Sequence, residues 1–168
     1  MTNAQYSMAT APQFVGRELG ASSWVTVDQD RIDRFADCTG DRQWIHVDPE
    51  WARNGPFGVT IAHGFFALSL STDLLNDIFS VDDVGVILNY GLNRVRFPAP
   101  LPVGSRVRMY AELAEALEIE GGIQAVYHLE FEIEGQQKPC CVADLLFRYY
   151  TNPERLGPAG AARPVEVT

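Results

Sequence analysis

The period of the hydrophobic pattern changes once along this chain, and that change constrains the fold more than any other feature. Residues 64–78 form a strongly apolar stretch without proline, whose apolar positions are spread around most of a helix. Residues 106–113 and 123–133 instead alternate between apolar and polar side chains, as antiparallel strands with one solvated face do. The pattern predicts one helix that is buried on most sides, followed by a sheet.

Further strands are predicted on either side of this alternation. Residues 142–150 are mostly apolar on both faces, which predicts a central strand, and residues 85–97 form another strand that Pro98 and Pro100 stop. A short strand over residues 22–27 comes first in the chain. The order of elements predicts an α+β domain in which an antiparallel sheet wraps around the long central helix, and the hot-dog fold is one member of that class.

Two shorter helices are predicted before the central one. Asp28 is expected to cap an amphipathic helix that ends at Gly40, and Asp48 to cap a helix with Pro49 at its first position. A polar loop lies between them. We therefore divide the chain into a frayed N-terminal segment (residues 1–13), a single domain (14–150) and a Pro/Ala-rich tail (151–168).

Composition excludes several classes of function. The chain is 46% hydrophobic and 21% charged, as an ordinary globular protein is, and its net charge of −9 disfavours binding to nucleic acid. No apolar stretch reaches the roughly 18 residues that a membrane span needs, and the start lacks the features of a signal peptide. Three cysteines, two of them adjacent, form no disulfide framework, and we expect Cys38 to be a small buried apolar residue. These features predict a cytoplasmic protein that binds neither nucleic acid nor membrane.

Asp41 and His46 are the first candidates for chemistry, because both lie in the polar loop between the two short helices. A carboxylate and an imidazole that converge can share a water molecule, and histidine titrates near neutral pH. The alternative is that Asp41 only caps backbone donors while His46 packs against the second helix. Spacing alone leaves both readings open.

Gly64 is the second candidate. A glycine at the start of a helix lets a ligand approach bare backbone N–H groups, where the helix dipole favours negative charge. This is the form of an oxyanion hole for a thioester or ester carbonyl. The alternative is that Gly64 only allows the helix to pack closely against a strand.

Two weaker patterns are compatible with a function and also with ordinary structural roles. His46, Asp48 and His63 resemble part of a site with two histidines and one carboxylate, but HExxH and CxxC spacings are absent from the sequence. Arginines two apart occur on two strands that we predict to be adjacent. These residues are Arg94, Arg96, Arg106 and Arg108. They form either a basic patch that suits the phosphates of a nucleotide tail, or ion pairs with acidic residues on neighbouring strands.

A family resemblance adds to this reading. Residues 35–49 read FADCTGDRQWIHVDP and resemble the hydratase-2 motif of the MaoC-like dehydratases, which are (R)-specific enoyl-CoA hydratases with a hot-dog fold. The stretches GPFG at 55–58 and IAHGF at 61–65 are similar to the same family. NYGLNRVRFP at 89–98 is most like the subgroup related to nodulation protein N. The resemblance covers residues 24–107 and continues more weakly to residue 150.

The resemblance implies roles for particular residues. Asp41 and His46 match the catalytic pair, and Gly64 matches the glycine whose N–H holds the thioester oxygen. Gln43 and Trp44 stand where many relatives have Asn and Pro, although Gln43 keeps an amide. Thr72 falls where some relatives have a serine near the pair. Candidate substrate-binding residues in the resembling stretches are Gln43, His63, Phe65, Thr72, Asn89, Arg94 and Arg96.

The implied function is (R)-specific hydration of a trans-2-enoyl thioester to the (R)-3-hydroxyacyl thioester, or the reverse dehydration. The acyl group would be carried by coenzyme A or acyl carrier protein, and no metal or other cofactor would be needed. The family also implies a homodimer. Two alternatives remain: an acyl-CoA thioesterase on the same fold, and a non-catalytic module that binds acyl thioesters.

Overall fold

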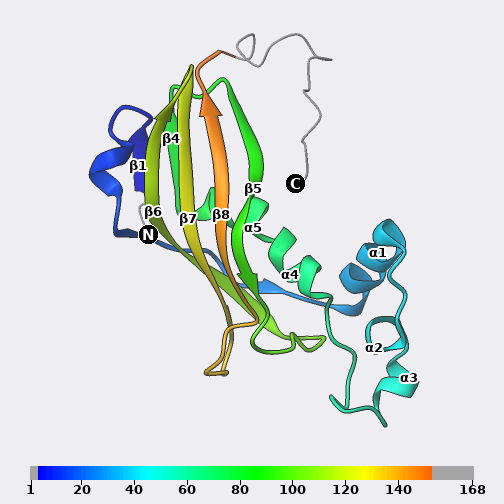
Figure 1. Ribbon diagram of the computed structural model, residues 1–168. Helices are drawn as coiled ribbons and strands as arrows, with labels where there is room; N and C mark the ends of the chain where they lie inside the picture. The colour runs from blue at the N-terminus through cyan, green and yellow to red at the C-terminus, as the bar shows by residue number, and fades with distance from the viewer. Residues whose placement is uncertain (1–3, 153–168) are drawn as a thin grey trace.

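The computed structural model describes residues 4–152, and a curved antiparallel sheet is its main element (Figure 1). The strands are hydrogen-bonded in the order β2, β6, β7, β8 and β5, and the short β3 also pairs with β6. The bounds are β2 (Arg17–Ala21), β3 (Val25–Thr26), β5 (Val86–Arg96), β6 (Arg106–Ile119), β7 (Gly122–Ile133) and β8 (Cys141–Tyr150).

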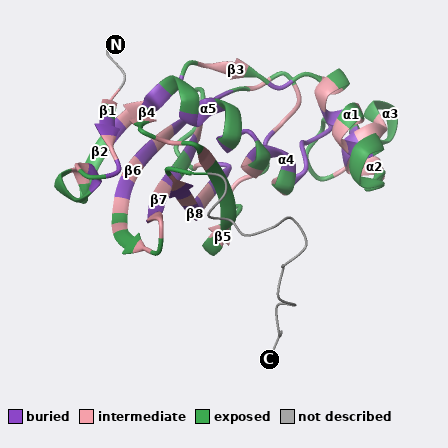
Figure 2. Cartoon of the chain, turned by 90° about the horizontal axis from the view of Figure 1, so that it is seen from above, coloured by how far each residue is buried: buried purple, intermediate pink, exposed green. Residues whose placement is uncertain are grey.

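The central helix lies against one face of this sheet. It consists of α4 (Gly64–Ser69) and α5 (Ser71–Ile78), which follow each other with a break at Leu70. Viewed from above, the sheet curves around α5 (Figure 2). Apolar side chains of the helical segment and of the sheet form one hydrophobic core. The helical segment contributes Phe66, Ala67, Leu70, Leu74, Leu75 and Ile78. This arrangement confirms the predicted α+β hot-dog fold.

One side of the central helix is not buried, which corrects the prediction of burial on most sides. Phe65 has 65% of its surface exposed, and Ser69, Thr72 and Asn76 continue the exposed row along α4 and α5. The apolar fraction of the segment indicated a buried helix, but it did not reveal that the sheet covers the helix from one side only.

The predicted alternation in the sheet is confirmed. Val107, Met109, Ala111 and Leu113 of β6 are buried, and β8 lies between β7 and β5 as a central strand should. Strand β5 forms one end of the strand order. The core contains three hydrogen-bonded tyrosine hydroxyls. The hydroxyl oxygen of Tyr127 lies 2.7 Å from those of Tyr6 and Tyr149.

The N-terminal prediction is wrong for residues 4–13. Strand β1 (Ala4–Ser7) pairs in parallel with β4 (Phe79–Asp82), and a 3-10 helix, η1 (Ala11–Phe14), follows. Tyr6 and Ala11 are buried against the core, which explains why this segment is ordered. Of the predicted tail, all but residues 151 and 152 lies outside the described part of the chain.

Three short helices stand beyond one end of the sheet (Figure 1). They are α1 (Gln29–Thr39), α2 (Trp44–Val47) and α3 (Pro49–Ala52). The predicted caps are confirmed: the Asp28 carboxylate accepts from the Arg31 N–H, and the Asp48 carboxylate accepts from the Trp51 N–H, both at 2.9 Å. Gly40 ends α1 with a φ of 79°, a conformation that favours glycine.

Several local predictions are corrected. The strand expected over 22–27 is only β3 (Val25–Thr26), and β2 precedes it where no strand was expected. The loop expected over 41–46 ends in the helical turn α2, which carries His46. Cys38 is exposed, while Cys140 and Cys141 are buried, and all three are free thiols. Among the helices of residues 4–152, none is long and apolar enough to cross a bilayer.

Candidate active site

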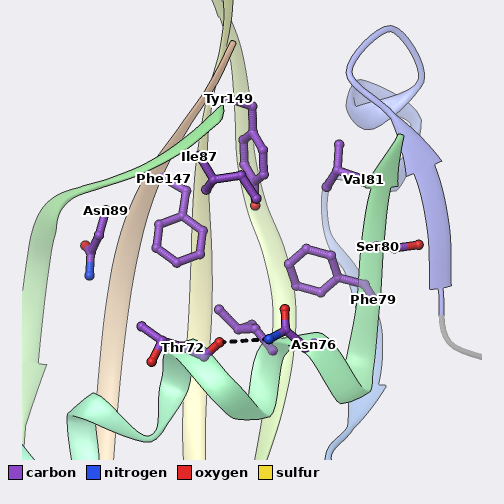
Figure 3. A pocket seen from close by; sticks show the side chains of 10 residues that line it. Thr72, Asn76, Phe79, Ser80, Val81, Ile87, Asn89, Phe147 and Tyr149 are labelled. Carbon is purple, nitrogen blue, oxygen red and sulfur yellow. Dashed lines mark hydrogen bonds between the residues drawn. The ribbon is translucent and has the colours of Figure 1, made fainter. Parts of the chain in front are cut away.

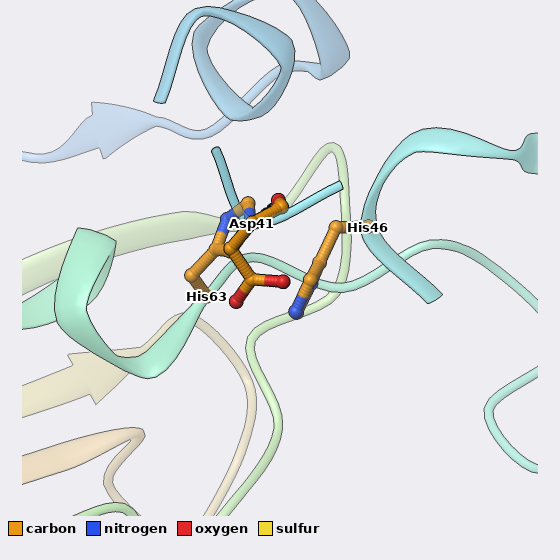
Figure 4. Close-up of side chains that lie close together, drawn as sticks. All are labelled: Asp41, His46 and His63. Carbon is orange, nitrogen blue, oxygen red and sulfur yellow. Dashed lines mark hydrogen bonds between the residues drawn. The ribbon is translucent and has the colours of Figure 1, made fainter. Parts of the chain in front are cut away.

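Asp41, His46 and His63 converge between the short helices and the start of the central helix (Figure 4). One carboxylate oxygen of Asp41 and one ring nitrogen of each histidine all lie within 4.8 Å of one another. Asp41 follows α1 and is exposed, His46 belongs to α2, and His63 is the N-cap residue of α4. Both histidines are almost fully buried, at 6% and 4% exposure. The structure therefore brings the predicted pair together and adds His63 to it.

The hydrogen bonds of His46 define its tautomer. Its Nδ1 lies 2.7 Å from the carbonyl oxygen of Ile61, and a carbonyl oxygen only accepts, so Nδ1 carries the proton. In the neutral ring, Nε2 is then an acceptor. Burial is the main cause that lowers the pKa of His46 below its ordinary value of 6.5, although the hydrogen bond to Ile61 and the Asp41 carboxylate oppose it. His46 is thus prepared to act as a neutral base through Nε2.

The backbone around His46 is held by residues that the sequence reasoning did not single out. The Ile61 N–H donates to the Ile45 carbonyl oxygen at 2.9 Å, so the two segments are paired. The Gln29 side chain donates to the His46 carbonyl oxygen at 2.7 Å and accepts from the Thr60 hydroxyl at 2.6 Å. A backbone carbonyl has no sequence signature, and a glutamine on a helix is usually a surface residue, so no sequence signal pointed to these contacts.

Asp41 caps its own segment only weakly. Its carboxylate accepts from the Gln43 N–H at 3.4 Å, which is long for such a bond. The carboxylate is directed toward the side of His46 in Figure 4. The geometry therefore favours a role for this carboxylate at the histidine over a purely local capping role.

Gly64 begins α4, so its N–H has no acceptor within the helix. A Cβ atom at this position would lie 2.9 Å from the ring of Phe97, which comes directly after β5. The close packing proposed as an alternative role for this glycine is therefore real. A bare N–H and close packing are compatible, since both require the absence of a side chain.

A cavity of about 200 Å³ adjoins these residues. His46, His63 and Gly64 line it together with mostly apolar side chains, which include Phe97, Leu101 and Cys140. Burial raises the pKa of the Cys140 thiol to about 12, so this sulfur remains protonated and is a poor nucleophile. His46 and His63 are the histidines that line this cavity, and Asp41 lies close to both of them without lining it.

The geometry of the same three residues does not suit a metal ion. The rings of His46 and His63 are stacked, with centroids 3.7 Å apart and planes 25° from parallel. The in-plane nitrogen lone pairs of stacked rings run side by side, whereas a metal ion requires lone pairs that converge. Asp48, the carboxylate in the metal hypothesis, caps α3 instead. The arrangement suits a water molecule better than a metal.

A larger cavity of about 460 Å³ lies between α5, β4, β5 and β8 (Figure 3). Thr72 and Asn89 line it with Phe79, Phe147 and Tyr149. None of its lining residues borders the cavity at His46. The structure therefore places Thr72 and Asn89 at a different cavity from the one that His46 lines.

The remaining predicted substrate-binding residues lie at the surface. Gln43 precedes α2 and is exposed, and Phe65 is exposed with its ring edge toward Phe97, at a centroid distance of 6.0 Å. Arg94 pairs with Asp144 at 3.4 Å, and Arg96 donates to the carbonyl oxygen of Val95. Of these four residues, Gln43 contacts the Asp41–His46 pair through its backbone: its N–H donates to the Asp41 carboxylate at 3.4 Å, and its carbonyl oxygen accepts from the His46 N–H at 2.9 Å.

The predicted basic patch is wrong in one respect. Strands β5 and β6 are not adjacent, because β7 and β8 lie between them. Arg106 and Arg108 form cross-strand pairs with Glu134 and Glu132, at 2.8 and 2.7 Å. The alternative of cross-strand ion pairs is therefore confirmed for β6 and, through Arg94 and Asp144, for β5.

Fold and site together define a hot-dog protein with a carboxylate–imidazole pair at the start of its central helix. A family model described as a MaoC-like domain matches residues 10–129, and the chain belongs to this family. A solved structure titled monoamine oxidase regulatory protein, from Archaeoglobus fulgidus, has the same fold. The two structures superpose with a TM-score of 0.72 and share 24% sequence identity. The matched region covers 90% of this chain and 100% of the Archaeoglobus chain.

Two curated relatives are similar over most of their length. The chain is 49% identical to 3-hydroxyacyl-thioester dehydratase Z of Mycobacterium tuberculosis over 85% of this chain and 95% of the relative. It is 44% identical to nodulation protein N of Rhizobium leguminosarum bv. viciae over 83% of this chain and 89% of that protein. The predicted enzyme class, a hydratase or dehydratase lyase, and the predicted subgroup are confirmed.

Proposed function

We propose that this protein catalyses the (R)-specific hydration of a trans-2-enoyl thioester, or the reverse dehydration of the (R)-3-hydroxyacyl thioester. The observation that carries the proposal is the convergence of the Asp41 carboxylate with a His46 ring whose Nδ1 is held by the Ile61 carbonyl. The name of the mycobacterial relative supports the reaction class. Coenzyme A and acyl carrier protein both present such a thioester on the same phosphopantetheine arm.

In this mechanism one water molecule bridges Asp41 and His46. Two hydrogen bonds of about 2.8 Å at a water oxygen span roughly 4.5 Å between their acceptors. A ring nitrogen of His46 and a carboxylate oxygen of Asp41 lie within 4.8 Å of each other, which is compatible with one bridging water molecule. The water would donate one hydrogen to Nε2 of His46 and the other to the carboxylate, which leaves an oxygen lone pair for attack.

In the hydration direction, the water oxygen attacks C3 of the conjugated thioester while His46 Nε2 takes its proton. The electrons of the C2–C3 double bond move toward the thioester oxygen and form an enolate. The enolate collapses as C2 takes a proton from the Asp41–His46 pair, so both side chains return to their starting protonation states. No cofactor enters this sequence, because the conjugated carbonyl already withdraws electrons from C3.

Gly64 supplies the remaining element of the mechanism. Its N–H is the first of α4 and lies at the positive end of that helix, beside the cavity that His46 also lines. A hydrogen bond from this group would stabilise the charge that develops on the thioester oxygen. Removal of one such donor typically lowers kcat by about 10²- to 10³-fold.

The test is loss of the conjugated enoyl-thioester absorbance with crotonyl-CoA, together with the variants Asp41→Asn and His46→Gln. We expect turnover by the wild type to the (R)-3-hydroxy product, and a loss of about 10²- to 10⁴-fold in each variant. His128→Gln is the matched control, because His128 lies on β7 and pairs with Asp144, away from the cavity.

Other outcomes would contradict the proposal. Release of free thiol without hydration would identify a thioesterase. Saturable binding of enoyl thioesters carried by both coenzyme A and acyl carrier protein, without turnover of either, would identify a binding module. Full activity of Asp41→Asn or His46→Gln would remove the pair from the mechanism.

We also propose that the chain forms a homodimer through β5. This strand ends the strand order of the described sheet, so one of its edges is not paired within the sheet. Its exposed side chains include Ile87, Leu88, Tyr90 and Leu92, and Phe65 of the helix is exposed as well. A second copy that pairs with this edge would cover these apolar groups.

Light scattering at micromolar concentration tests the dimer directly. We expect twice the mass of the chain, and we expect Leu92→Lys to shift the protein toward monomer, because Leu92 is 41% exposed on β5. The control is Leu117→Lys, an exposed leucine at the far end of β6. A monomeric mass for the wild type would contradict the proposal.

A further inference from the structure

We propose that His63 is a positioning residue, which holds the Asp41 segment and the ring of His46 in register through its neutral Nε2–H tautomer. This assignment replaces the substrate-binding role that the sequence suggested for His63. It rests on the proposed function, and it predicts a measurable effect on His46 even without substrate.

The first contact is between His63 and the backbone of Asp41. Its Nε2 lies 2.9 Å from the carbonyl oxygen of Asp41, which can only accept, so Nε2 carries a proton. Asp41 itself is exposed and its local capping contact is long, at 3.4 Å. The bond from His63 therefore ties an exposed segment to the start of the central helix, twenty-two positions further along the chain.

The second contact is between the two imidazole rings. His63 stacks on His46 with a centroid distance of 3.7 Å, and it also meets Phe35 of α1 at 5.1 Å. His63 thus fills the space between α1 and the ring of His46. The stack shields His46 from water, which is consistent with the lowered pKa that burial gives to that residue.

The third observation concerns the other nitrogen of His63. Its Nδ1 is buried and has no hydrogen-bond partner within residues 4–152. Protonation there would create a buried N–H without a protein acceptor, next to a second imidazole. The titratable side chains that converge with His63 are His46 and Asp41. A neutral His63 can stack on His46 whether the His46 ring is neutral or protonated, because it adds no second positive charge.

Two substitutions separate the two contacts. In His63→Gln, the side-chain amide can reach the position of Nε2 and donate to the Asp41 carbonyl, but the ring stack is lost. In His63→Phe, the ring stack is kept and the donor is lost. Both side chains are neutral, so neither variant changes the charge of the site.

We expect each variant to lower kcat by about 10- to 100-fold, the scale of loss when a catalytic group is misplaced by about 1 Å. KM should change by less than about threefold, since His63 does not bind substrate in this proposal. The acid limb of the pH profile should move toward pH 6.5 in His63→Gln, where His46 loses its shield, and should stay in place in His63→Phe.

The His46 titration is also measured by NMR without substrate. The chain has three histidines, so the assignment is tractable, and His128 serves as an internal control whose titration should not change. We expect the pKa of His46 to rise in His63→Gln and not in His63→Phe. This readout separates a failure of the proposed reaction from a failure of the positioning role.

Two results would overturn the assignment. A rise in KM of more than tenfold with unchanged kcat would make His63 a substrate-binding residue. An unchanged His46 titration in a folded His63→Gln would show that the stack does not act on His46. If His63→Phe does not fold, the titration of His63→Gln alone decides.

Discussion

Nδ1 of His46 donates a hydrogen bond of 2.7 Å to the carbonyl oxygen of Ile61, and this one bond determines how the histidine can react. The proton is held on the buried side of the ring, so the neutral form offers Nε2 to the cavity. Because the acceptor is a carbonyl and not a carboxylate, the bond orients the ring without adding a negative charge that would hold it protonated. This is the form of the ring that the proposed mechanism requires of its base.

The pH dependence of activity follows from this arrangement. Burial lowers the pKa of His46 from 6.5, so the ring is neutral and reactive at pH values where an exposed histidine is already half protonated. In the hydration direction, kcat/KM should have an acid limb with a midpoint below pH 6.5. A midpoint above pH 6.5 would contradict the assignment of His46 as the base.

The same shift predicts a pH dependence of stability. A histidine whose pKa is lowered by folding stabilises the folded state above its unfolded pKa of 6.5, and this contribution is lost as the pH falls through the folded value. The free energy of unfolding should therefore decrease from pH 7 to pH 5 less steeply in His46→Gln than in the wild type. Urea unfolding at several pH values measures this, and equal slopes would refute it.

Gly64→Ala should lower activity for two reasons that can be separated. The new methyl group would lie about 2.9 Å from the Phe97 ring and would also crowd the N–H that we propose as the donor to the thioester oxygen. We expect a loss of at least about tenfold in kcat. Adding Phe97→Ala relieves the clash, so a double variant that recovers full activity would show that packing, and not the N–H, was affected.

Gln29 should support catalysis from outside the cavity. Gln29→Leu removes the bond to the His46 carbonyl and should lower kcat by about tenfold, with a loss of stability of about 1–3 kcal/mol. Thr60→Val removes only the hydroxyl that donates to Gln29 and keeps the bond to His46. We expect a similar loss of stability but a smaller effect on kcat, and equal kcat values for the two variants would contradict this.

The three hydrogen-bonded tyrosines should contribute to stability and not to catalysis. Tyr127→Phe removes the hydroxyl that contacts both Tyr6 and Tyr149, which leaves two buried hydroxyl groups short of a partner. We expect a loss of about 1–3 kcal/mol in the free energy of unfolding, with unchanged kcat.

The fold could be predicted because its main elements have strong local periods. The alternation along β6 and β7 reflects a sheet with one buried face, and any sequence that forms such a sheet must repeat with a period of two. The apolar segment of residues 64–78 likewise had to be a core helix. The exposed row at Phe65 was not predicted, because composition alone does not tell which side of a helix the sheet covers.

The candidate site was predicted only where its residues are close in sequence. Asp41 and His46 share one short segment between Gly40 and Pro49, so their proximity is a local property. The arginines show the opposite case. Their pairing depends on the order of strands, which no local pattern encodes, and β5 and β6 are separated by two other strands.

The sequence by itself determined the central helix and the long strands of the sheet, the caps at Asp28 and Asp48, and the presence of a carboxylate and an imidazole in one segment. Only the tertiary structure decided how that imidazole is protonated and held. The Ile61 carbonyl and the His63 ring come from the segment that leads into α4, and the Gln29 amide comes from α1. They contact His46 because these two segments lie against the same short stretch of chain, and such long-range contacts arise from packing and not from local periodicity.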